Sequence, residues 1–147
     1  MKGYFNKPEA TAACLSPDGW FRTGDVAVVD EHGWFAIVDR VKELIKYKGL
    51  QVAPAELEAV LLANPAIADA AVIPVPDDDA GEVPKAFIVQ RAPITAERVM
   101  AFVAERVSPY KKVRVVEFVE SIPKSPSGKI LRRLLVDRER QAAANAQ

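Results

Sequence analysis

The chain has 147 residues, half of them hydrophobic, and its 20 basic and 20 acidic side chains give a formal net charge of zero. This length suits one domain with a short appendage, while the balanced charge argues against a general binder of nucleic acid or anionic membranes. No apolar run approaches the roughly 20 residues of a membrane span. With a single cysteine, Cys14, and no signal-like start, the sequence predicts a cytoplasmic protein.

The first forty residues predict irregular chain followed by a small β-ribbon. Residues 8–13 favour a short helical turn among glycines and prolines. Residues 26–29 and 34–38 are rich in strand-forming side chains, and residues 30–33 between them suit a hairpin loop. A two-stranded ribbon is marginal on its own, so we expect it to lie on another sheet.

The rest of the chain predicts a compact α+β domain. We expect a hairpin over residues 44–52, a helix beginning at Pro54, strands at 67–75, 86–90 and 113–119, a helix capped by Thr95, a loop at 123–128 and a final helix over 130–141. This order favours a small domain with a three-stranded sheet and flanking helices. We place the boundary near residues 39–42, which divides the chain into a ribbon part (1–40) and a compact domain (41–147).

Three short segments stand out for their chemistry, namely residues 19–25, 39–58 and 123–130. In the first, Asp25 follows a glycine at the mouth of a strand. Its two oxygens suit neighbouring hydroxyl groups such as those of a ribose, although an aspartate in an ordinary turn is the simpler interpretation. In the third, Lys129 ends a loop of Pro, Ser and Gly, where a lysine either binds phosphate or is only a surface residue.

The middle segment is basic and resembles a hinge. It places Arg40, Lys42, Lys46 and Lys48 on a short stretch that is either a solvated linker with a hairpin or a binding surface. Gly49 is most simply a turn residue that needs a positive φ. None of the three segments is a Walker-type phosphate loop, because the earlier glycine of that motif is absent before Lys129.

In this order and at this spacing, the three segments resemble the last motifs of the adenylate-forming superfamily of acyl-CoA synthetases, beetle luciferases and peptide-synthetase adenylation domains. Residues 38–40 (VDR), 44–49 (LIKYKG) and 51–58 (QVAPAELE) are most similar to the 4-coumarate–CoA ligase and luciferase-like branch. The resemblance runs through the whole chain but covers only the tail of the family's length. It implies the C-terminal lid of an ATP-dependent carboxylic acid–CoA ligase, preceded by a β-ribbon fragment of the N-terminal body.

The resemblance implies a role for seven positions. Members of the superfamily join a carboxylate to AMP and then transfer the acyl group to a thiol, and the lid rotates between the two half-reactions. Lys129 and Lys46 are the implied catalytic residues, Asp25, Arg40 and Gln51 bind ATP or AMP, Lys42 is the hinge, and Gly49 lines the CoA channel. No residue is predicted as a metal ligand, and ATP with magnesium is expected to bind mainly to the N-terminal body, with CoA as co-substrate.

The implied partners are the N-terminal adenylation body, a small carboxylic acid, and a lysine acetyltransferase that recognises the loop before Lys129. Since the phosphate loop and the acyl pocket are absent from this sequence, the chain alone is expected to be inactive. Two alternatives stay open. The acceptor could be a carrier-protein thiol or oxygen instead of CoA, or the chain could be a free-standing, non-enzymatic interaction or regulatory domain.

Overall fold

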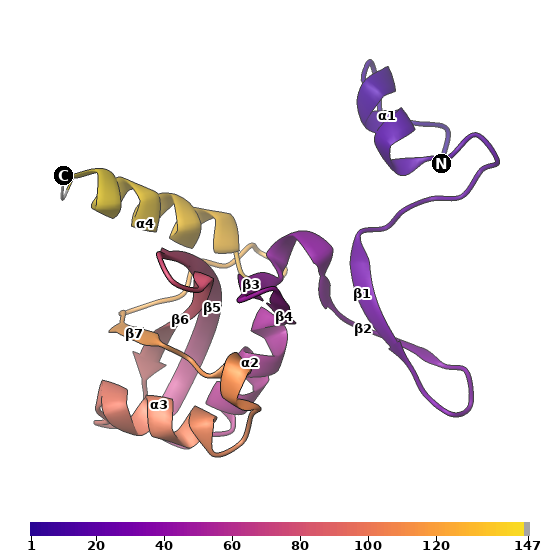
Figure 1. Cartoon of the computed structure of the whole chain (residues 1–147). Coiled ribbons are helices and arrows are strands. Elements are labelled where there is room, and N and C mark those ends of the chain that lie inside the picture. Colours follow the sequence, from indigo (N-terminus) through magenta and orange to yellow (C-terminus); the bar gives the residue numbers. More distant parts are fainter. Residues whose placement is uncertain (146–147) are drawn as a thin grey trace.

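The computed structural model describes residues 1–145 and contains a five-stranded mixed sheet with helices on both faces (Figure 1). In chain order the elements are α1 (Pro8–Cys14), β1 (Asp25–Val29), β2 (Phe35–Arg40), the 3₁₀ turn η1 (Val41–Glu43), β3 (Ile45–Tyr47), β4 (Leu50–Val52), α2 (Pro54–Leu62), β5 (Ile67–Asp77), β6 (Gly81–Gln90), α3 (Ala96–Ala104), the 3₁₀ turn η2 (Pro109–Lys111), β7 (Val115–Phe118) and α4 (Arg132–Asn145). The predicted α+β class is confirmed.

Strand β6 is the centre of the sheet. It pairs with β5 in antiparallel fashion along nearly its whole length, and its other edge pairs with β7 in parallel and with β3 at Tyr47 and Gly81. The hairpin of β3 and β4 therefore adds two strands to the three that the sequence predicted. Two side contacts hold it there: the Lys46 amide donates to Glu82 Oε2 at 2.8 Å, and the Lys48 amide donates to the Ala80 carbonyl at 2.9 Å.

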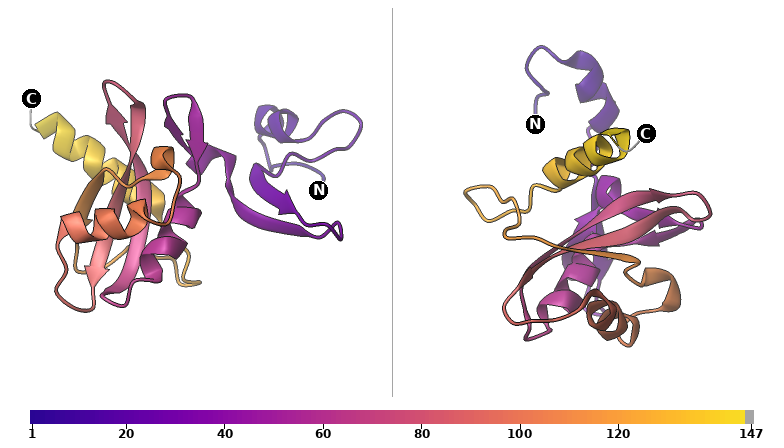
Figure 2. Two further views of the ribbon diagram at one scale, coloured as in Figure 1. Left: turned by 60° about the horizontal axis from the view of Figure 1, so that its bottom comes forward. Right: turned by 90° about the vertical axis from the view of Figure 1, so that its left-hand side faces the viewer.

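Both faces of the sheet are buried. Along β5, Ala70 and Val72 point into a core shared with α2 and α3, whereas Ala71 and Ile73 point into a second core beneath α4. Successive side chains of a strand face opposite sides, so a strand between two helical layers must be apolar at nearly every position. The views in Figure 2 show α4 and the pair α2 and α3 on opposite sides of the sheet.

The helix boundaries follow local chemistry. Helix α2 starts at Pro54, as predicted, and α3 is capped by Thr95, whose hydroxyl accepts a hydrogen bond from the Arg98 amide. Helix α4 begins at Arg132, slightly later than expected, because the Lys124–Ile130 bridge keeps residue 130 extended. Within residues 1–145, none of the helices has the length and apolar character that crossing a membrane requires.

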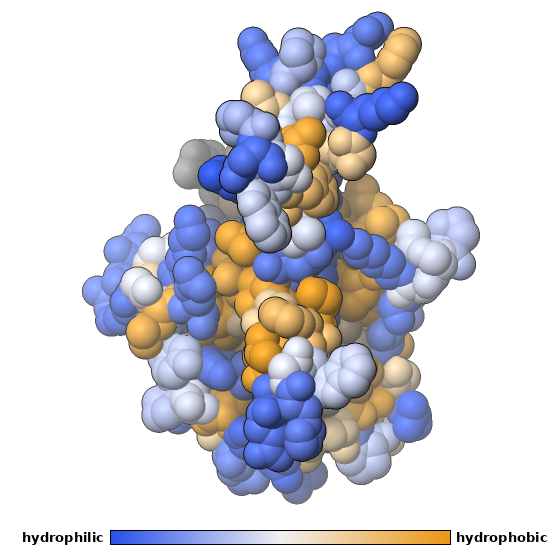
Figure 3. Space-filling model, turned by 90° about the vertical axis from the view of Figure 1, so that its right-hand side faces the viewer, coloured by the Kyte–Doolittle hydropathy of each residue, from blue (hydrophilic) through white to orange (hydrophobic). Residues whose placement is uncertain are grey.

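Strands β1 and β2 form a separate two-stranded sheet, which we call the ribbon, and it projects from the five-stranded sheet (Figures 1 and 2). Large side chains on it and beside it are exposed, including Trp20, Trp34 and Phe35 at about three quarters each. The side of the molecule that bears the ribbon carries apolar surface at its centre (Figure 3). The division of the chain at residues 40 and 41 remains a prediction.

Candidate active site

A hollow of about 380 Å³ lies where the base of the ribbon, η1, the start of α2 and the loop before α4 meet. Three residues that the sequence singled out line it: Asp25 on β1, Arg40 on β2, and Lys129 before α4. Glu43 and Arg132, which the sequence analysis did not select, line it as well. The fold thus brings residues of all three segments to one place, although the segments are far apart along the chain.

Asp25 and Arg40 are cross-strand partners at the base of the ribbon. They face each other in the β1–β2 register, and Arg40 Nε lies 3.3 Å from Asp25 Oδ1. Gly24, at φ 75°, allows the sharp turn that starts β1, and the Gly24 carbonyl accepts a hydrogen bond from the Val41 amide at 2.9 Å. The hollow therefore has a carboxylate and a half-exposed guanidinium side by side, and both are strong hydrogen-bonding groups for a polar ligand.

Lys129 stands on a closed loop, residues 123–130, which we call the lysine loop. An antiparallel bridge joins Lys124 to Ile130 at its base, and the Ser125 amide donates to the Lys129 carbonyl at 2.8 Å. The Lys129 amide in turn donates to the Ser125 hydroxyl at 3.1 Å. The backbone of the loop is thus fixed while the Lys129 side chain stays exposed, which suits a cation that reaches an anionic ligand.

The other predicted residues do not reach this hollow. Lys46 and Gln51 are opposite each other on the β3–β4 hairpin, and both are exposed. Gly49, at φ 80° after Lys48 at φ 47°, closes the hairpin in a left-handed turn, and a Cβ at Gly49 would meet no atom within 4 Å. The turn, not crowding, accounts for the glycine in this chain. The exposed Lys42 in η1 connects the ribbon to the hairpin.

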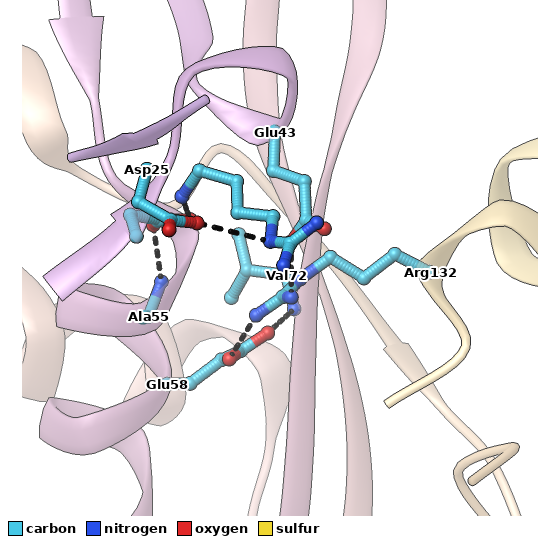
Figure 4. A network of polar contacts seen from close by, with 8 residues as sticks. Asp25, Glu43, Ala55, Glu58, Val72 and Arg132 are labelled. Atoms are coloured by element: carbon cyan, nitrogen blue, oxygen red, sulfur yellow. Dashed lines mark hydrogen bonds and ion pairs between the residues drawn. The ribbon is translucent and has the colours of Figure 1, made fainter. Parts of the chain in front are cut away.

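A buried ionic network lies beside the hollow, and Figure 4 shows it from close by. The Arg132 guanidinium pairs with Glu43 Oε2 and Glu58 Oε2, at 2.5 Å each, and Glu58 Oε1 accepts a hydrogen bond from the Val72 amide at 2.9 Å. Burial raises the pKa of Glu58, although the Val72 amide and Arg132 act in the opposite direction. A glutamate on the apolar face of α2 was the only sequence signal for this network.

Asp39 is the second buried acidic residue near the hollow. It is the second-last residue of β2, and its carboxylate accepts hydrogen bonds from the Arg40 amide at 2.7 Å and from the Ala55 amide at 3.2 Å. The second bond satisfies a free amide at the start of α2, where a negative charge is also favourable. In the described part of the chain, residues 1–145, no group of three His, Cys, Asp or Glu side chains is placed to hold a metal ion.

The fold is that of the C-terminal domain of AMP-binding, adenylate-forming enzymes. Residues 56–129 match the family described as AMP-binding enzyme C-terminal domain, and the chain belongs to this family, in its 4-coumarate–CoA ligase-like branch. It is 60% identical over 138 residues to 4-coumarate–CoA ligase-like 6 of Oryza sativa subsp. japonica. It is 56% identical over 138 residues to the peroxisomal OPC-8:0-CoA ligase 1 of Arabidopsis thaliana.

The chain spans about a quarter of these relatives' length, since the matches cover 92% of the chain but 23% and 25% of the two ligases. Solved structures of similar fold likewise match this chain over only about a quarter of their length. ATP-bound MatB from Rhodopseudomonas palustris is 34% identical, with a TM-score of 0.85 over 91% of this chain and 27% of that one. The amide bond synthetase McbA from Marinactinospora thermotolerans is 38% identical, with a TM-score of 0.83 over 93% of this chain and 28% of that one.

Proposed function

We propose that the chain is the C-terminal lid of an ATP-dependent carboxylic acid–CoA ligase and is inactive without an N-terminal adenylating body. The observation that carries the proposal is the meeting of Asp25, Arg40 and Lys129 around one hollow. The identity of 56–60% to ligase-like relatives supports it.

In the first half-reaction, Asp25 accepts hydrogen bonds from the ribose hydroxyls of ATP and Arg40 assists beside it. Lys129 places its ammonium group where the substrate carboxylate attacks the α-phosphate. Negative charge develops on those oxygens, and a cation already in position stabilises it without reorganisation. This step requires Lys129 to lie beside Asp25 and Arg40, and the hollow that the three residues share supports it.

In the second half-reaction, Lys42 acts as the hinge and the β3–β4 hairpin turns toward the body. Lys46 and Gln51 then face the adenylate, and Gly49 lies beside the pantetheine arm of CoA, where a side chain would intrude. The hairpin exposes all three residues and keeps them away from the hollow, which supports a lid with one working face for each half-reaction.

The test is to incubate the purified chain with ATP, magnesium, CoA and a panel of aromatic and fatty acids, and to measure acid-dependent release of pyrophosphate and AMP. We expect no release from the chain alone and turnover when the matching N-terminal body is added. Lys129→Ala should then lower adenylate formation on the order of 100- to 1000-fold. Lys124→Ala is the matched control, since Lys124 is on the same loop but pairs with Asp69 at 2.6 Å. Release by the isolated chain would refute the proposal.

A different acceptor is the second candidate. McbA, one of the structures of similar fold, is an amide bond synthetase, so a lid of this kind also serves an enzyme whose name denotes amide formation. Supplying the complete enzyme with free CoA, a carrier-protein thiol, oxygen or an amine after adenylate formation identifies the acceptor. Product with CoA alone supports the ligase. A stable complex with another protein and no effect of Lys129→Ala would favour a non-enzymatic interaction domain.

We also propose that acetylation of Lys129 regulates the lid. The side chain is exposed on a loop, and acetylation removes the positive charge. The complete ligase carrying acetyl-lysine only at position 129 should lose adenylate formation and regain it on deacetylation; unchanged activity would contradict the idea. A cytoplasmic location likewise remains a proposal, and one of the relatives is a peroxisomal ligase by name.

A further inference from the structure

Arg132 connects the lysine loop to the rest of the compact domain. It is the first residue of α4 and follows directly after the base of the loop, where the Leu131 amide donates to the Pro123 carbonyl at 2.9 Å. The backbone of the loop is closed by its own hydrogen bonds, so its orientation depends on how this base is held. The Arg132 side chain is mostly buried, with 16% of its surface exposed, and it points into the domain (Figure 4).

The guanidinium of Arg132 joins two carboxylates from different elements. Glu43 ends η1, one residue after the proposed hinge Lys42, and Glu58 lies on α2. Glu58 is itself fixed by the Val72 amide of β5. A planar guanidinium fork can hold two carboxylates at once, whereas a lysine is a single point charge. The network therefore ties the hinge segment, α2, β5 and the lysine loop together through one side chain.

We propose that Arg132 is a positioning residue that locks the lysine loop to the hinge segment, so that Lys129 is presented to the hollow in a fixed geometry when the lid closes for adenylate formation. This inference rests on the proposed function. Arg132 is not assigned contact with substrate, because its charge is already shared between Glu43 and Glu58. Its effect comes through the placement of Lys129, where an error of about 1 Å can cost roughly 100-fold in rate.

The experiment separates the two half-reactions in the complete ligase that contains this chain. Acid-dependent ATP–pyrophosphate exchange reports adenylate formation, and transfer from a synthetic acyl adenylate to CoA reports the second step. Arg132→Lys should lower exchange by roughly 10- to 100-fold and leave transfer unchanged, because the hairpin that serves transfer does not depend on the lysine loop. Arg133→Lys is the matched control: Arg133 is 91% exposed, and its Nε lies 3.6 Å from Asp137 Oδ2.

A second variant keeps the inference testable if Arg132→Lys unfolds the lid. Glu43→Gln leaves the Arg132–Glu58 pair and the core intact, and it should show the same selective loss of exchange. The double variant should lose little more than either single one, because both changes break one linkage. Equal losses in both half-reactions, or full exchange in both variants, would overturn the inference. A wild-type ligase without any acid-dependent exchange would instead refute the proposed function itself.

Discussion

At the scale of single residues, Asp39 shows how one side chain joins the ribbon to the compact domain. Its carboxylate accepts the Ala55 amide at the start of α2, although Asp39 belongs to β2. Asp39 therefore caps helix α2 from another element, because the residue at the capping position, Ala53, makes no side-chain hydrogen bond. Asp39 is only 8% exposed, so water does not readily replace it.

We predict that Asp39→Ala lowers the free energy of unfolding by about 0.5–2 kcal/mol, the range found for loss of a helix cap. Urea denaturation of the chain, followed by circular dichroism, measures this difference. Glu31→Ala is the control, because Glu31 is a carboxylate in the turn between β1 and β2 and its side chain is 88% exposed; it should change the unfolding free energy by less than about 0.5 kcal/mol. Equal effects of the two substitutions would contradict the capping role.

Individual site residues were predictable only where a motif carried them. Asp25, Arg40 and Lys129 were selected from separate segments, and the fold places them around one hollow. Arg132 and Glu43 were not selected, because their significance lies in a contact between residues 89 positions apart. Sequence position alone does not reveal which charged residues near a helix end are buried together, and for that reason the network required the structure.

At the scale of elements, the sequence predicted the existence of each helix and strand better than their pairing. Periodicity and turn residues indicated the β3–β4 hairpin. Its attachment to β6 depends on hydrogen bonds made by a side chain in the β5–β6 turn, which is far from the hairpin in the sequence. The Asp77 carboxylate accepts hydrogen bonds from the amides of Asp79 and Ala80 at 3.1 and 2.8 Å. These bonds make the β5–β6 turn tight, and β6 can therefore begin at Gly81. That early start gives β3 its partner residue, so a three-stranded prediction became a five-stranded sheet.

Helix α4 is held on the sheet by a charged cluster as well as by Leu135. Lys85 on β6 lies 2.8 Å from Glu117 on β7 and 2.7 Å from Glu139 on α4, and Glu117 also pairs with Arg138. Burial raises the pKa of the Glu117 carboxyl, but Lys85 and Arg138 outweigh it and hold the pKa below its ordinary value of 4.5. A lowered pKa in the folded state means that ionised Glu117 stabilises the fold above that value, and that this stabilisation is lost as the pH falls.

We therefore predict that Glu117→Gln destabilises the chain at pH 7 by up to about 1 kcal/mol, a small effect because a partly exposed ion pair is screened by solvent. The gap between wild type and variant should close as the pH falls through the lowered pKa, below 4.5. Urea titrations at several pH values between neutral and strongly acidic measure it. Glu120→Gln, at an exposed neighbouring position, is the control, and a gap that did not vary with pH would argue against the ionic contribution.

At the scale of the whole molecule, the two parts differ in how they are stabilised. The five-stranded sheet has a buried core on each face, whereas the ribbon exposes Trp34, Phe35 and Ile37 by 65% or more. A two-stranded ribbon is marginal alone, and contiguous apolar surface favours association. The compact part could be predicted from sequence because the spacing of its apolar residues reflects which side chains are buried on the two faces of the sheet. The surroundings of the ribbon could not, because exposed apolar side chains alone do not show what covers them.

The division at residues 40 and 41 predicts that a fragment of residues 41–147 folds on its own. Both cores are formed by residues from 45 onward, so the fragment keeps them intact. It loses Asp39, however, and with it about 0.5–2 kcal/mol of helix capping, whereas a fragment of residues 39–147 should recover most of that difference. Denaturation of the two fragments and the whole chain measures the free energies, and sedimentation should show that removing the ribbon lowers self-association. A 41–147 fragment without a cooperative transition would show that the ribbon is part of the folding unit and that the boundary is misplaced.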